Sequence, residues 1–203
     1  MQNLIPWLFV VVLTACASGT KSDEMNGVTI VEVKPNQWTA LAKNHMFDLL
    51  SQYKLQPFLF TKTIHLESRV IPHSHPVLTL NTRHAKEPNK LLATWLHEEF
   101  HWWLDQNADQ TDKAIEEFRK LYPTLPTQGI AQNEHSTYLH LAVCFLEFKA
   151  ITKFLGKDTA KAIIKDHVTK DKIYPWIYVQ VLNQELEIAS ILHQHKLIPP
   201  GLR

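Results

Sequence analysis

Two histidines and a glutamate stand at a spacing that can bind a metal ion and use it. The segment His97-Glu98-Glu99-Phe100-His101 has the pattern HExxH. Residues four apart lie on one face of a helix, with about 5–6 Å between their Cβ atoms. His97 and His101 could therefore chelate one Zn²⁺, because imidazole nitrogens are common zinc ligands. Glu98, beside that face, could accept a proton from the attacking water and pass it to a leaving amine.

This motif resembles that of the zincin metallopeptidases. In those enzymes an edge strand precedes the HExxH helix and can pair with an extended substrate, and a later helix supplies a third zinc ligand. The resemblance implies that His97 and His101 are zinc ligands, that Glu98 is the general base and acid, and that the reaction is peptide-bond hydrolysis. It covers roughly residues 77–151 and assigns no role to Glu99, which we expect to be a solvated helix residue.

Three residues are candidates for the third protein ligand of a catalytic zinc: His140, Glu147 and Glu134. His140 and Glu147 are seven residues apart, two helical turns, and so share a helix face. A histidine and a glutamate on a largely buried helix are costly unless they are paired or bind a metal. Glu134 lies in Asn133-Glu134-His135-Ser136-Thr137, which resembles part of the ligand helix of some zincins of the gluzincin branch.

The register of the helices ranks these candidates. If the helix predicted over 133–155 runs antiparallel to the HExxH helix, His140 reaches the level of the second histidine of the motif. Glu147 then lies about 10 Å further along. There it could pair with Lys90 or hold the first histidine through a hydrogen bond. We therefore rank His140 slightly above Glu147 as the third ligand and place Glu134 third, although gluzincins use a glutamate at this position.

The resemblance also implies a Tyr or His opposite the general base that stabilises the oxyanion. Tyr174, Tyr178 and His167 are candidates, although an aromatic cluster is also typical of a core. His73 and His75 precede the strand predicted before the motif. We do not expect both of these histidines, which are two residues apart in an extended segment, to bind one metal, and we expect them to be loop residues.

Helices must position most of these side chains. Apolar residues at helical spacing predict helices over 36–53, 88–105, 111–121, 133–155, 158–167 and 175–192. Segments rich in β-branched or alternating residues predict strands over 28–33, 58–69 and 76–82. We expect Asn36 and Thr111 to cap helices, Pro88 to begin the HExxH helix and Gly156 to end a later one. The predicted fold class is α+β: a mainly helical, zincin-like domain with a small sheet whose edge strand precedes the HExxH helix.

The N-terminal segment has the features of an export signal. Residues 5–13 are almost wholly apolar but too short to cross a bilayer as a helix, which takes about 20 residues. Leu13-Thr14-Ala15-Cys16 resembles the lipobox of bacterial lipoproteins. The resemblance implies a signal peptide over 1–15, a lipidated Cys16, a polar tether over 16–27 and a single domain over 28–203. Ala17, by the same resemblance, favours the outer membrane, facing the periplasm.

The composition narrows the function further. The 203 residues are 45% hydrophobic and 20% charged, which is typical of one globular domain. The formal net charge is +1, so no strong positive field exists to attract nucleic acid, and we expect no such partner. Two cysteines, one of them Cys16, argue against a disulfide framework.

We therefore predict a lipid-anchored, zinc-dependent metallopeptidase that acts on a peptide or protein substrate. Two alternatives keep His97 and His101 on the metal. One is a zincin-like lipoprotein that binds a metal or a partner without turnover. The other is a zinc hydrolase of a non-peptide amide, such as cell-wall material. Replacement of Glu98 by Gln separates an enzyme from an inactive protein, because only an enzyme has hydrolysis to lose.

Overall fold

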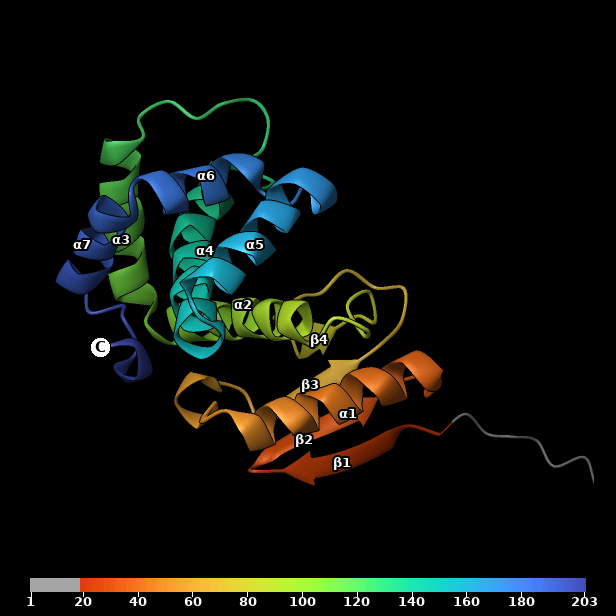
Figure 1. Ribbon diagram of the computed structural model, residues 1–203. Helices are drawn as coiled ribbons and strands as arrows, with labels where there is room; N and C mark the ends of the chain where they lie inside the picture. Colours follow the sequence, from red (N-terminus) through yellow and green to blue (C-terminus); the bar gives the residue numbers. More distant parts are fainter. Residues whose placement is uncertain (1–18) are drawn as a thin grey trace, which may run out of the picture.

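Seven α-helices and a four-stranded sheet make up residues 19–203, the part of the chain that this computed structural model describes (Figure 1). The strands are β1 (Lys21–Met25), β2 (Val28–Glu32), β3 (Thr63–Leu66) and β4 (Leu78–Leu80). The helices are α1 (Gln37–Gln52), α2 (Pro88–Gln106), α3 (Ala108–Leu121), α4 (Glu134–Leu155), α5 (Lys157–Asp166), α6 (Pro175–Asn183) and α7 (Glu185–Gln194). Short helical turns are η1 (Gln56–Phe58), η2 (His167–Asp171) and η3 (Pro200–Leu202). The predicted α+β, mainly helical fold class is confirmed.

The sheet has the strand order β1-β2-β3-β4. β1 is antiparallel to β2, whereas β2, β3 and β4 are parallel to one another. β4 is an edge strand and is the strand that precedes α2 in the chain, as predicted. In Figure 1, α2 lies between the sheet with α1 on one side and the remaining helices on the other. The helix that carries the HExxH motif therefore joins the two layers of the molecule.

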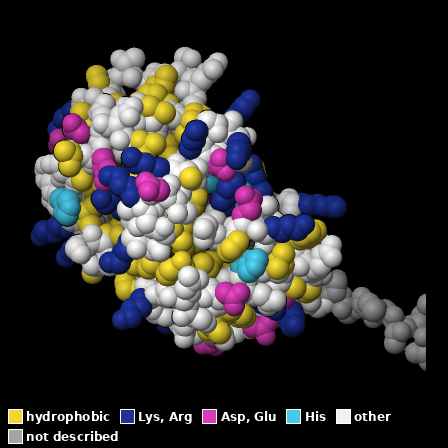
Figure 2. Space-filling model, in the orientation of Figure 1, with side chains coloured by type: hydrophobic (Ala, Val, Ile, Leu, Met, Phe, Trp, Pro, Cys, Tyr) yellow, Lys and Arg dark blue, Asp and Glu magenta, His cyan; other side chains and the backbone are white. Residues whose placement is uncertain are grey.

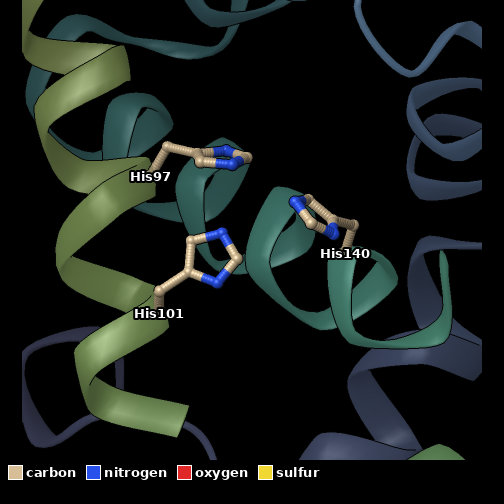
Figure 3. A group of neighbouring side chains, drawn as sticks. All are labelled: His97, His101 and His140. Atoms are coloured by element: carbon tan, nitrogen blue, oxygen red, sulfur yellow. The ribbon is translucent and has the colours of Figure 1, made fainter. Parts of the chain in front are cut away.

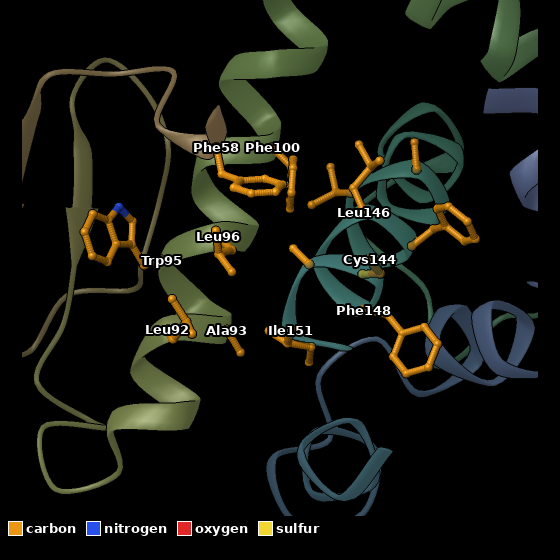
Figure 4. Packing of buried hydrophobic residues seen from close by; sticks show 14 of the residues in the cluster. Phe58, Leu92, Ala93, Trp95, Leu96, Phe100, Cys144, Leu146, Phe148 and Ile151 are labelled. Atoms are coloured by element: carbon orange, nitrogen blue, oxygen red, sulfur yellow. The ribbon is translucent and has the colours of Figure 1, made fainter. Parts of the chain in front are cut away.

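Apolar packing holds α2 against α4. Figure 4 shows Leu96 and Phe100 of α2 facing Leu146 and Ile151 of α4, and all four side chains are buried. Trp95 lies on the opposite side of α2 and is also fully buried. Removing such side chains from water stabilises the folded state by about 25 cal/mol for each Å² of apolar surface. Because α2 is buried on both sides, its polar residues are held in fixed positions.

The predicted polar tether is wrong for residues 21–25, which form strand β1 and pair with β2 along their whole length. The turn that joins the two strands is Asn26-Gly27, with φ angles of 53° and 79°. Asn-Gly is a preferred pair for a two-residue hairpin turn, because both residues tolerate positive φ. The Asn-Gly pair is thus the sequence signal for this hairpin, and the domain includes β1.

An ion-pair cluster, in which Lys43 and Glu32 are buried, ties β1 and β2 to α1. Lys43 of α1 contacts the carboxylates of Asp23 in β1 and Glu32 in β2. The Thr39 hydroxyl also donates a hydrogen bond of 2.6 Å to Glu32. Burial alone would raise the pKa of Glu32, but the hydrogen bonds from Lys43 and Thr39 outweigh it and lower that pKa. Lys43 therefore compensates a carboxylate that would otherwise be costly to bury.

Replacing Lys43 with Met should lower the free energy of unfolding by about 3 kcal/mol at neutral pH, because Glu32 is left buried without its cation. In the wild type the pKa of Glu32 is lower in the folded chain than in the unfolded chain. The stabilisation is therefore present above the ordinary pKa of 4.5 and is lost as the pH falls through the folded value. The difference in stability between the two proteins should therefore shrink as the pH falls below 4.5, which urea unfolding at several pH values measures.

Lys34→Met is the matched control for this prediction. Lys34 forms an exposed ion pair with Glu67, and exposed pairs contribute about 1 kcal/mol or less. An equal loss of stability in the Lys34 and Lys43 variants would contradict the role assigned to the buried cluster.

Three predicted elements differ from the structure. The strand predicted over 58–69 is limited to β3, because η1 and its connection to β3 replace the first half. α3 begins at Ala108 rather than after Thr111, whose hydroxyl donates to the carbonyl of Leu104 at 2.8 Å. The helix predicted over 175–192 is divided into α6 and α7. Predicted helix ends are confirmed at Asn36, Pro88 and Gly156.

The surface carries charges of both signs. Figure 2 shows one face of the molecule, on which basic and acidic side chains are interspersed with hydrophobic ones. Within residues 19–203, no helix is both long enough and apolar enough to cross a membrane. The predicted signal peptide, residues 1–15, and the predicted lipidation site, Cys16, lie outside the described residues.

Candidate metal centre

Two helices bring three histidines together. His97 and His101 lie one turn apart on α2, and His140 projects toward them from α4 (Figure 3). One possible ligand atom from each side chain lies within 4.8 Å of the other two. The centroids of the three rings are 4.9 to 5.6 Å apart. Of the three candidates for the third ligand, His140 is the one that the structure brings to both histidines of the motif.

Hydrogen bonds orient two of the three imidazole rings. Nδ1 of His97 lies 2.9 Å from Oε2 of Glu147, which also accepts a hydrogen bond of 2.7 Å from the Tyr178 hydroxyl. Nδ1 of His140 lies 2.6 Å from the carbonyl oxygen of Ser136, one turn earlier on α4. An acceptor on one ring nitrogen fixes the proton there and leaves the other nitrogen for a metal. In both rings Nε2 is the nitrogen that is left for a metal. The hydrogen bond between Nδ1 of His97 and Glu147 therefore supports that ring in its orientation.

Glu134 and Lys90 have partners elsewhere. Glu134 is exposed at the start of α4 and pairs with Arg119 at 2.8 Å. Within residues 19–203, Glu134 belongs to neither group that could hold a metal. The prediction that it could be the third ligand is therefore wrong. Lys90, the alternative partner of Glu147, instead pairs with Glu87 at 2.8 Å and with Asp166 at 3.0 Å.

A second group of possible ligands lies deeper and consists of His97, Cys144 and Glu147. Oε2 of Glu147 is already engaged, and its buried Oε1 has no hydrogen-bond partner among the described residues, with Nε2 of His167 3.7 Å away. Burial raises the pKa of the Cys144 thiol, which opposes the thiolate form that binds metals. The three-histidine group needs no thiolate, and we take it as the candidate metal centre.

Burial favours the neutral, metal-binding form of two rings. It lowers the pKa of His140 to about 4 and that of His101 well below its ordinary value, and a charged His97 adds to both shifts. Burial also opposes a proton on His97, but hydrogen bonds with Cys144 and Glu147 outweigh it and raise the pKa of His97 well above its ordinary value. A histidine held by a carboxylate beside neutral imidazoles is a common arrangement at protein metal sites.

Glu98 lines a pocket beside His97. The pocket has a volume of about 360 Å³ and is bounded by α2, by the segment before β4 and by the residues that lead into α6. The Glu98 side chain is buried and has no hydrogen-bond partner among residues 19–203. Burial raises its pKa, although His97 and His73 act in the opposite direction. An unpaired carboxylate in a pocket next to three histidines is positioned to exchange protons with a bound molecule.

The three candidates for the oxyanion-stabilising residue, Tyr174, Tyr178 and His167, all line this pocket. Tyr178 and His167 contact Glu147, whereas Tyr174 lies beside the histidines. The Tyr178 hydroxyl donates a hydrogen bond to Glu147, and the ring of His167 stacks on that of Tyr178 with centroids 5.6 Å apart. The Tyr174 ring lies 4.4 Å from that of His140, measured between centroids. The backbone φ of Tyr174 is 42°, in the left-handed region, and such backbone strain is often found at functional sites.

Glu99 is buried, so the prediction that it is a solvated helix residue is wrong. It is fully buried, and its carboxylate accepts hydrogen bonds from the backbone amides of Phe60 at 2.7 Å and Thr61 at 3.1 Å and from Nε1 of Trp95 at 3.1 Å. Burial raises the pKa of Glu99 to about 7, against the effect of these hydrogen bonds. Glu99 thus ties the chain before β3 to α2, whereas the adjacent Glu98 has no hydrogen-bond partner among the described residues.

The residues at the centre fit a zinc ion. Three histidines form a known donor set for catalytic zinc, in which a fourth position stays open for water or substrate. Comparisons of the chain with protein families, curated proteins and solved structures found no match.

Proposed function

We propose that this protein is a zinc-dependent hydrolase of peptide bonds, with His97, His101 and His140 as the metal ligands. The observation that carries this proposal is the convergence of three imidazoles beside a buried, unpaired Glu98 that lines a pocket. A structural zinc site usually has four protein ligands and needs no free carboxylate next to it. A centre with three ligands, a general base and space for a substrate supports catalysis instead.

The chain's own residues supply the proton transfers. Zinc, when bound, would polarise the substrate carbonyl and make a water molecule more acidic. Glu98 accepts a proton from the attacking water, a role suited to a carboxylate whose pKa burial raises. It then gives that proton to the nitrogen of the breaking C–N bond. The Tyr174 hydroxyl stabilises the oxygen that gains negative charge, and Glu147 holds His97 in position.

Two other functions would use the same metal ligands. A zincin-like protein that binds a metal or a partner without turnover has no need of Glu98 as a base. A zinc hydrolase of a non-peptide amide would use Glu98 in the same way and differ only in its substrate. The unpaired state of Glu98 in the pocket favours an enzyme over the inactive alternative, because burying a carboxylate without a partner is costly.

The wild-type protein should bind about one zinc ion and hydrolyse peptides only when zinc is present, because the ligands and the base act together. Metal analysis and digestion of a broad peptide library, with metal-free protein as the control, measure both properties. A protein that binds one zinc and cleaves no peptide would reject the peptidase. Digestion of cell-wall fragments by the same sample would then distinguish the amide hydrolase from the inactive protein.

We also propose that Cys16 carries a lipid anchor at the outer membrane, as its resemblance to a lipobox implies. β1 begins at Lys21, so only residues 17–20 separate this cysteine from the sheet. Five Cα–Cα steps span at most about 18 Å, and the domain would therefore lie close to the membrane surface. Mass analysis of the mature chain should find Cys16 at its N-terminus with a diacylglyceryl group on its thiol, and an unmodified cysteine would reject the anchor.

A further inference from the structure

The outer edge of β4, where a zincin pairs an extended substrate, is covered by the chain itself. Only Thr79 in this three-residue strand directs its backbone groups outward, because successive residues direct theirs to opposite edges. The Thr79 amide donates to the His73 carbonyl at 2.8 Å, and the His73 amide donates to the Thr79 carbonyl at 3.0 Å. An extended substrate therefore finds the outward backbone groups of β4 already bonded.

The covering segment is fixed to α2. Nε1 of Trp102 donates a hydrogen bond of 2.8 Å to the carbonyl of Ser74. The Trp102 ring also stacks on that of His75, with centroids 4.1 Å apart. On the other side of His73, Ile71 and Pro72 line the pocket that contains Glu98. The segment is thus a wall of the candidate site.

This wall limits the size of a substrate. The pocket volume of about 360 Å³ is near the lower end of the range of roughly 300–1,000 Å³ for small-ligand sites. The walls beside His97 and Glu98 are largely apolar and include Ile71, Pro72, Ile130, Ile173 and Pro175. Such a space suits one end of a short chain with an apolar side chain better than the middle of an extended strand.

Charged residues in the pocket distinguish the two ends of a peptide. Among the described lining residues, Glu98 is the one carboxylate, and the proposed chemistry uses it as the base. Lys172 is the one ammonium group there, and it is exposed and has no ion-pair partner within the described part of the chain. Lys172 would attract a free carboxylate, whereas a terminal amine would find no second carboxylate to bind.

Building on the proposed function, we propose that the substrate is short and binds through its carboxyl-terminal residue. The apolar side chain of that residue fills the pocket, and its free carboxylate lies at Lys172. Water adds its oxygen to the carbonyl carbon of the last amide bond, and the C–N bond breaks. The terminal amino acid leaves with the proton that Glu98 accepted from water, and the new carboxyl group stays on the remaining part.

Binding of N-acetyl-leucine and N-acetylleucinamide to the Glu98→Gln protein tests this proposal without turnover. The two probes differ only in the free carboxylate. We expect the acid to bind about 10-fold more tightly by calorimetry, a preference that Lys172→Gln removes and Lys172→Arg retains. Lys157→Gln changes an exposed lysine outside the pocket and should keep the preference. Each titration is done with and without zinc, because a carboxylate can also bind the metal.

The outcomes separate this inference from the proposed function. Equal binding of acid and amide, a preference unchanged by Lys172→Gln, or a preference that appears only with zinc would overturn the role of Lys172. Hydrolysis of long peptides blocked at both ends would overturn the preference for a carboxyl terminus while leaving the peptidase intact. A wild-type protein that shows the lysine-dependent preference but hydrolyses nothing would support the binding site and reject the enzyme.

Discussion

Replacing His140 with Ala should lower the affinity for zinc by more than about 100-fold, which exceeds the 10- to 100-fold typical for loss of a residue that only supports a ligand. The physical reason is that, in the proposed centre, His140 contributes one of three metal-binding nitrogens. His97 and His101 alone would leave the ion half exposed to water. Metal analysis after dialysis and competition with a chromophoric chelator measure the change. Stoichiometric zinc in the wild type should become nearly undetectable in the variant.

His135→Ala is the matched control, because His135 is an exposed residue of the same helix that belongs to neither group of possible ligands. It should bind zinc as the wild type does. Glu147→Ala separates the two groups: loss of its support for His97 should weaken binding by about 10- to 100-fold. If Glu147→Ala abolishes zinc binding and His140→Ala does not, the deeper group with Cys144 is the metal site.

Replacing Glu98 with Gln should leave zinc binding unchanged and lower the rate of hydrolysis by about 10²- to 10⁴-fold. Gln has nearly the same shape as Glu but cannot accept the proton of the attacking water at neutral pH. Because Glu98 has no hydrogen-bond partner among the described residues, the substitution removes no structural contact there. Steady-state kinetics on the best peptide from the library, together with metal analysis, measure the two properties separately.

Glu134→Gln serves as the control for Glu98→Gln, because it changes an exposed glutamate that pairs with Arg119 at the surface. Its activity should match that of the wild type. A zinc-loaded Glu98→Gln protein that keeps full activity would show that another group is the base. Glu99→Gln is unsuitable as a control, since Glu99 is buried and holds three hydrogen-bond donors.

Much of the helical structure could be predicted because its signals are local. Asn36 caps α1 through its side chain, Pro88 occupies the first turn of α2, and Gly156 with its φ of 84° ends α4. Strands are harder to predict from the sequence, because a strand forms only where a partner strand lies beside it. Residues 21–24 are polar and show no apolar alternation, yet β2 pairs with every residue of β1, and Lys43 forms an ion pair with Asp23.

The environment of Glu99 shows why burial is harder to predict than periodicity. Adjacent residues on a helix project in directions about 100° apart, so Glu98 and Glu99 must face different neighbours. The sequence does not say which of them meets solvent. That depends on the chain around Phe60, more than thirty residues earlier, whose backbone amides Glu99 binds. A buried carboxylate is costly without such partners, and those partners exist only in the folded chain.

The pairing of His97 with His101, and the position of Glu98 beside them, follow from the amino-acid sequence, because the spacing of four residues on a helix is a local property of the backbone. That His140 lies beside these histidines, and that Glu147 forms a hydrogen bond with His97, is seen in the folded chain alone. Those assignments depend on the register between α2 and α4. Neither helix specifies that register alone, since it follows from the packing of their apolar faces across a long connection.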